Sequence, residues 1–240
     1  MNKDRLSKYQ SFQLRQSFNF VNLLNPIPLT TAPYTREQEI ANSLTHGIGI
    51  ILSIVGIPVL MALAVKQGYN TPTLLAFALY CTSLLAVFAS STLYHAVPDL
   101  GIKRIFKMID HICIYFLIAG TITAFVTRYV DSATATKFLF FLWTLVAAGI
   151  GYKFYYLGKN KLISTLIYAG LIATVSFVIR PIVAQISFSA TVLIFSGIAA
   201  YGIGTFFYMS KNIYYQHAIW HILVLGGSAC HYVALVQCCN

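Results

Sequence analysis

The sequence is poor in charged residues, and acidic residues are especially rare. Of its 240 residues, 6 are Asp or Glu and 16 are Lys or Arg, so that charged residues make up 9% of the chain. Soluble domains carry about 25% charged residues, because a folded chain needs a polar surface in water. Since 58% of the residues are apolar, most of the protein surface is predicted to face lipid.

Other absences narrow the class further. The net charge of +10 is spread singly between apolar runs, and without a basic stripe and interleaved aromatics it does not predict nucleic-acid binding. The first 30 residues contain no apolar stretch followed by a small-residue cleavage site, so no cleavable signal peptide is predicted. The five cysteines form no CxxC pair and no disulfide framework.

Long apolar segments dominate the rest of the chain. About 20 helical residues cross a membrane core, since each rises about 1.5 Å, and these segments are too long and too continuously apolar for barrel strands. The predicted fold is therefore an all-α polytopic membrane domain over 36–240, preceded by a partly ordered or disordered extension, 1–35. Its seven predicted spans are 44–65, 73–96, 109–127, 138–157, 162–179, 187–208 and 213–237.

The basic residues predict how the chain is oriented. With seven spans, 12 of the 16 Lys and Arg residues fall on the side of the N-terminus. Cytoplasmic loops carry the excess of basic residues, so the N-terminus is predicted to be cytoplasmic and the C-terminus outside. The expected location is a cell membrane, specifically a bacterial inner membrane. The four basic residues on the other side are Lys66, Arg128, Lys137 and Arg180.

Histidines gather near the predicted cytoplasmic ends of the spans. His217 and His221 are four residues apart and share one helix face, while His95 ends the second span with Ser91 one turn before it. Three neutral imidazoles would leave the fourth position of a tetrahedral zinc open for water, as in catalytic sites. Asp110, which opens the third predicted span, would hold that water or take its proton.

Structural roles for the same residues stay open. The paired histidines could hydrogen-bond lipid headgroups or backbone carbonyls instead of a metal. Asp110 could pair with Lys107 or cap its helix, and Ser91 could bond to its own helix. The sequence alone does not decide between these roles and a zinc site.

Three further histidines are predicted to be structural. His46 closes the segment 39–47, which is interpreted as a capped helix entry, and His111 points away from its neighbour Asp110. His231 is predicted to hydrogen-bond a neighbouring helix. Four glycines are predicted to allow close helix contacts: Gly149, Gly151, Gly226 and Gly227.

Four short motifs carry a family resemblance. They are EIANSLTHG at 39–47, STLYH at 91–95, DHICIY at 110–115 and HAIWH at 217–221. In order and spacing the chain resembles the haemolysin III-like branch of the progestin and adiponectin receptor family. The resemblance covers about residues 37 to 235 and leaves the N-terminal extension outside it.

The resemblance implies a function as well as a fold. It implies a zinc ion bound by His95, His217 and His221. Asp110 would contact the zinc-bound water, and Ser91 would support the site. The wider superfamily includes alkaline ceramidases, which implies hydrolysis of a membrane lipid amide or ester. The alternatives are a pore-forming or cytolytic protein, or a membrane-lipid sensor, with structural zinc. Homo-oligomers are compatible with the sequence.

Overall fold

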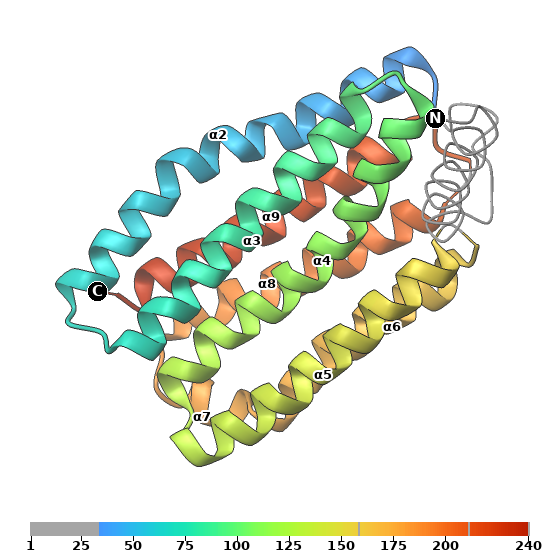
Figure 1. Ribbon diagram of the computed structural model, residues 1–240. Helices are drawn as coiled ribbons and strands as arrows, with labels where there is room; N and C mark the ends of the chain where they lie inside the picture. Colours follow the sequence, from blue (N-terminus) through green and yellow to red (C-terminus); the bar gives the residue numbers. More distant parts are fainter. Residues whose placement is uncertain (1–33, 158, 211, 240) are drawn as a thin grey trace, which may run out of the picture.

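The computed structural model describes residues 34–157, 159–210 and 212–239, and these segments form helices without any strand. The helices lie side by side as an elongated bundle (Figure 1). In chain order they are α2 (Arg36–Lys66), α3 (Thr71–Ala96), α4 (Leu100–Tyr129), α5 (Ser132–Tyr156), α6 (Lys161–Ala173), the 3-10 helix η1 (Thr174–Phe177), α7 (Ile179–Val183), α8 (Phe188–Met209) and α9 (Gln216–Gln237). The prediction that the extension 1–35 is partly ordered or disordered concerns residues that, except for the last two, lie outside the described part of the chain.

Six of these helices are long and apolar enough to cross a membrane: α2, α3, α4, α5, α8 and α9. The fifth predicted span, 162–179, is not one continuous α-helix, because α6 ends at Ala173 and η1 and α7 follow it. Pro181 lies inside α7. Pro181 has no N–H to donate to the carbonyl of Phe177, four positions earlier, and its ring crowds that carbonyl, which accounts for the interruption between η1 and α7. Over the described residues the structure is therefore all-helical and contains six candidate spans.

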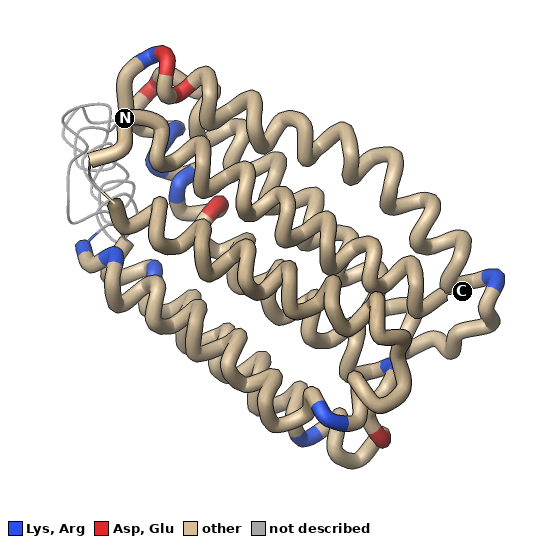
Figure 2. The backbone as a smooth tube through the Cα atoms, turned by 180° about the vertical axis from the view of Figure 1, so that it is seen from behind, with Lys and Arg blue, Asp and Glu red and all other residues tan. Residues whose placement is uncertain are grey.

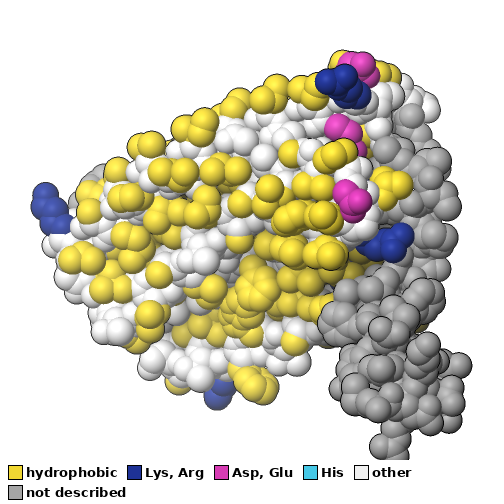
Figure 3. All heavy atoms as spheres, turned by 45° about the horizontal axis from the view of Figure 1, so that its top comes forward, with side chains coloured by type: hydrophobic (Ala, Val, Ile, Leu, Met, Phe, Trp, Pro, Cys, Tyr) yellow, Lys and Arg dark blue, Asp and Glu magenta, His cyan; other side chains and the backbone are white. Residues whose placement is uncertain are grey.

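The distribution of polar and apolar side chains fits a membrane protein. Lys, Arg, Asp and Glu gather mainly at the two ends of the bundle and leave its long middle almost uncharged (Figure 2). Apolar side chains cover the flank between these ends (Figure 3). Large exposed side chains such as Phe140, Phe188 and Phe206 are compatible with lipid as the solvent and costly in water.

Two helices begin well before their predicted apolar spans. Thr35 and Gln38 form a capping box that starts α2 at Arg36, so the interpretation of 39–47 as a helix entry is wrong. The Asp99 side chain accepts a hydrogen bond from Ile102 N at 2.8 Å and starts α4. Asp110 consequently lies in the third turn of α4 instead of opening the helix.

Helix contacts bring distant parts of the chain to the same place. α3 packs between α2 and α4, and α9 packs against α8 and α2. Two of the four predicted glycine contacts are confirmed: a Cβ at Gly227 would lie 3.0 Å from Gly197 O, and Gly149 faces the Tyr115 ring. The same prediction is wrong for Gly151 and Gly226, where a Cβ would meet nothing within 4 Å among the described residues. The start of α2 lies beside the end of α3 and the start of α9, where Glu39 contacts His95 and Asn42 contacts His221.

Candidate metal centre

Three histidines from two helices meet inside this bundle. His95 ends α3, and His217 and His221 lie in the first two turns of α9. Their candidate ligand nitrogens all lie within 4.8 Å of one another, and all three residues are buried. The Nε2 atoms of His95 and His217 are 3.1 Å apart. Two nitrogen ligands of a tetrahedral zinc are separated by about 3.3 Å when each Zn–N bond is about 2.0–2.1 Å, so the spacing fits a shared ion.

Glu39 fixes the orientation of His95. The His95 Nδ1–H donates to Glu39 Oε2 at 2.6 Å, and Glu39 Oε1 forms an ion pair with Lys103 Nζ at 2.9 Å. Lys103 also donates to the backbone oxygens of Tyr94 and Val97 at the end of α3. With Nδ1 protonated, His95 Nε2 keeps its lone pair and points toward His217.

His221 is fixed in the same way by the backbone of α2. Its Nδ1–H donates to Asn42 O at 3.0 Å, and Thr45 Oγ1 lies 3.2 Å from the same nitrogen. The opposite nitrogen, Nε2, is buried and has no hydrogen-bond partner among the described residues. A carbonyl or carboxylate behind each metal-binding imidazole is the usual outer shell of a zinc site. The residues present therefore fit a metal ion.

The other two predicted site residues, Ser91 and Asp110, are also buried. Ser91 is fully buried, one turn before His95, and its side chain faces the Asp110 carboxylate. Asp110 is 3% exposed and lines a cavity. Within the described segments no hydrogen bond joins Asp110 to the three histidines, so the role given to Asp110 stays a prediction.

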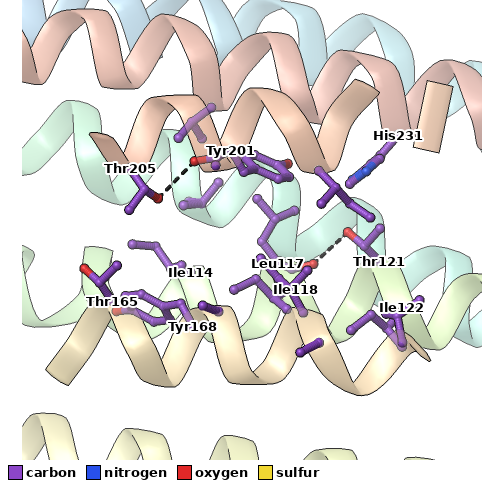
Figure 4. Close-up of a pocket in the computed structure, with 18 of the residues that line it drawn as sticks. Ile114, Leu117, Ile118, Thr121, Ile122, Thr165, Tyr168, Tyr201, Thr205 and His231 are labelled. Atoms are coloured by element: carbon purple, nitrogen blue, oxygen red, sulfur yellow. Dashed lines mark hydrogen bonds between the residues drawn. The ribbon is translucent and has the colours of Figure 1, made fainter. Parts of the chain in front are cut away.

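That cavity runs between α4, α6, α8 and α9 and has a volume of about 450 Å³. Figure 4 shows Ile118 and Ile122 of α4 facing Tyr201 and His231 across it. Its volume lies within the range of about 300–1,000 Å³ of small-molecule sites. Its lining also includes His46, Asp110 and Trp220. A mostly apolar pocket whose lining includes buried polar groups suits a lipid chain with a polar head.

The chain just before α2 covers the histidines. The Tyr34 ring centroid lies 4.9 Å from that of His217 and 5.7 Å from that of His95. Thr35 Oγ1 lies 3.0 Å from the hydroxyl of Tyr214, which precedes α9. Burial raises the pKa of Tyr34, so its phenol stays protonated and can donate a hydrogen bond. Sequence reasoning missed Tyr34, because it placed residues 1–35 outside the membrane domain.

The remaining histidines divide into two kinds. His231 is confirmed as a bridge between helices, since its Nε2–H donates to Ile194 O at 3.1 Å. His111 donates to the Lys107 carbonyl at 2.8 Å, as a structural residue would, yet it also lines the cavity. His46 stacks on His221, with ring centroids 3.7 Å apart. None of the three belongs to the group whose geometry fits a metal.

Comparison with known proteins identifies relatives along most of the chain. The family described as haemolysin-III related matches residues 34–232. A protein named Hemolysin-3 homolog from Bacillus subtilis is 35% identical over 206 residues, which cover 86% of this chain and 96% of that protein. Hemolysin-3 from Bacillus cereus is 34% identical over 193 residues, covering 80% and 88%. Human monocyte to macrophage differentiation factor is 27% identical over 208 residues, covering 84% of each chain.

Proposed function

Because this chain belongs to the haemolysin-III related family and brings three buried imidazoles together beside an apolar cavity, we propose that it is a zinc-dependent membrane hydrolase that cleaves a lipid amide or ester. The observation that carries the proposal is His221. Its Nδ1–H is held by Asn42 O, and its buried Nε2 has no protein partner within the described segments. Leaving such a nitrogen unpaired costs about 1–3 kcal/mol, and a metal ion would remove that cost.

Each part of the site has a role in this proposal. His95, His217 and His221 hold the zinc, which when bound polarises a carbonyl and lowers the pKa of water toward about 7. Asp110 accepts a proton from the attacking water and returns it to the leaving group. Ser91 Oγ, buried one turn from His95, donates a hydrogen bond to the reacting group. The cavity takes the acyl chain, so the substrate enters from the bilayer.

The direct test of this function is a lipid panel. Purified protein loaded with one zinc per chain is incubated with acyl amides and acyl esters in vesicles, and released fatty acid is measured. We expect release from at least one member, and removal of the zinc with a chelator should stop it. No release from any lipid of a broad panel would count against the enzyme.

The names of the two Bacillus relatives favour a second candidate, a membrane-perturbing protein with structural zinc. A wide aqueous pore needs a continuous polar lining. The cavity is instead lined mostly by Ile, Leu, Val, Ala and aromatic side chains. Leakage of vesicles that persists after chelation, without fatty-acid release, would support this second candidate over the hydrolase.

The carboxylate behind His95 gives a prediction about metal affinity. Glu39→Gln should weaken zinc binding by about 10–100-fold, because outer-shell partners of metal-binding histidines have effects of this size. Zinc competition titrations measure the change. Glu37→Gln on the exposed side of the same helix is the matched control and should bind zinc like the unmodified protein. Equal affinities for all three proteins would contradict the role of Glu39.

The orientation of the chain forms part of the proposal. We place the N-terminus in the cytoplasm and count α6, η1 and α7 together as the fifth of seven crossings, in a cell membrane. Ser132 is the first residue of α5, and Lys159 lies just beyond its last residue, Tyr156. In intact cells, an impermeant thiol reagent should label Ser132→Cys but not Lys159→Cys. The reverse pattern, measured against the background of the native cysteines, would invert the topology.

A further inference from the structure

Two lysines are buried inside the bundle, and their surroundings differ. Lys103 is 3% exposed, and its ammonium forms an ion pair with Glu39 at 2.9 Å and donates to backbone carbonyls. Lys153, on α5, is 1% exposed, but within the described segments no hydrogen bond or ion pair reaches its ammonium. Buried charges in proteins are paired, because an unpaired one is costly. Lys153 therefore indicates a negatively charged group that the described residues do not supply.

A tyrosine places the Lys153 ammonium beside the cavity. Lys153 Nζ lies 5.1 Å from the centre of the Tyr168 ring, and Tyr168 lines the cavity between α4 and α6 (Figure 4). The Tyr168 hydroxyl donates to His111 O at 3.0 Å, which fixes the ring between the two helices. An aromatic face attracts an ammonium but does not neutralise it. The charge therefore stays available to a ligand at this end of the cavity.

Two more lysines lie around the same end. Lys107 is half-buried on α4 and lies within electrostatic range of Lys153 and of Lys161, the first residue of α6. Lys161 Nζ lies 5.0 Å from the centre of the Tyr208 ring, which also lines the cavity. Asp110 is within electrostatic range of both Lys107 and Lys153. One carboxylate cannot neutralise two ammonium groups, so positive charge remains in excess.

We infer that Lys107, Lys153 and Lys161 bind the phosphate of a lipid whose chain lies in the cavity. The three lysines come from α4, α5 and α6, and a terminal phosphate has three free oxygens to offer them. Lysine is a common phosphate ligand in proteins. The mostly apolar lining of the cavity suits a lipid better than a free phosphate. The inference deepens the proposed function by naming the head of the substrate, and it rests on that function only for the cleavage step.

The test measures binding with two lipids that cannot be hydrolysed. Both carry the same brominated chains in ether linkage to glycerol, and one ends in a phosphate while the other ends in a hydroxyl. In uncharged detergent micelles the bromine quenches Trp220, which lines the cavity, in a Trp143→Phe background. We expect the phosphate lipid to bind about tenfold more tightly or better, because hydrogen bonds to charged groups have effects of this size.

Substitutions show whether the lysines cause this preference. Lys153→Met keeps the apolar stem and removes the charge, and it should reduce the preference to about twofold or less; Lys107→Met should weaken it in the same direction. Lys159→Met is the matched control, since Lys159 lies over the exposed Tyr156 ring, outside the cavity lining, and it should keep the full preference. Without lipid, Lys153→Met should melt no lower than the unmodified protein, because it loses an unpaired buried charge.

Several results would overturn the inference. Equal affinity for the two lipids would refute it, as would a preference that survives in both Lys153→Met and Lys107→Met. A lower melting temperature of Lys153→Met with the preference intact would mean that Lys153 only supports the fold. If Lys153→Met did not fold, Lys107→Met would decide on the same ratio of affinities. Inorganic phosphate that displaced the phosphate lipid at equal concentration would show a site for free phosphate and refute the lipid as its occupant.

The failure of the hydrolase proposal can be recognised separately. Cleavage is measured with ester-linked and amide-linked forms of the same two lipids. If none is cleaved but the ether-linked phosphate lipid binds with the expected preference, the hydrolase is rejected and the phosphate site remains. If the lipids are cleaved and bound equally well with either head, the hydrolase stands and the phosphate site is rejected.

Discussion

Replacing Asp110 with asparagine should lower the rate of lipid hydrolysis by about 10²–10⁴-fold, the usual contribution of a general base, and leave the zinc in place. Asparagine has nearly the same shape but cannot accept the proton. The zinc should stay because the proposed ligands are His95, His217 and His221, and no hydrogen bond joins Asp110 to them in the described part of the chain. Fatty-acid release and metal content, measured on the same preparation, check both halves of the prediction.

The matched control for this change is Asp99→Asn. Asp99 is the N-cap residue of the helix that carries Asp110, α4. Asparagine caps helices about as well as aspartate. This control should keep full activity. If Asp110→Asn were as active as the control, a proton-transfer role for Asp110 would be wrong. If vesicle leakage persisted unchanged in Asp110→Asn and after chelation, the membrane-perturbing alternative would gain.

Replacing His217 with alanine should remove the zinc from the purified protein and, with it, the hydrolysis. Removing a direct ligand should cost more than the loss of an outer-shell partner, which is about 10–100-fold in affinity. The protein should also melt at a lower temperature than the zinc-loaded form, because a ligand that binds only the folded state stabilises it. Metal analysis and thermal unfolding in detergent check both effects.

His231→Asn is the control for this variant. His231 lies on the same helix, α9, but outside the three-histidine group, and asparagine can still donate a hydrogen bond toward Ile194 O. This control should keep its zinc. A His217→Ala protein that bound zinc as tightly as His231→Asn would exclude His217 as a ligand.

The sequence predicted the membrane-embedded parts of the helices better than their ends. Apolar runs mark where a helix meets lipid, but α2 and α4 extend beyond these runs toward polar residues such as Glu39 and Lys103. The capping residues Thr35 and Asp99 mark where α2 and α4 begin. A search for capping residues upstream of each apolar run would have placed Asp110 inside its helix.

The three clustered histidines were predictable because helical spacing and short motifs identify them. The residues that orient these histidines were harder to predict. Glu39 reaches His95 only because α2 and α3 pack together, and nothing in the local sequence indicates a contact across 56 positions. The same holds for the cavity and for the stacking of His46 on His221, which depend on how separate helices meet. Such features need coordinates.

X-ray absorption at the zinc edge of the purified, unmodified protein tests the central claim most directly. One zinc per chain, bound by three imidazole nitrogens and one oxygen at about 2.0–2.1 Å, is the result expected for the site formed by His95, His217 and His221. Sulfur ligands at about 2.3 Å, or a protein that binds no zinc when the metal is supplied, would contradict it.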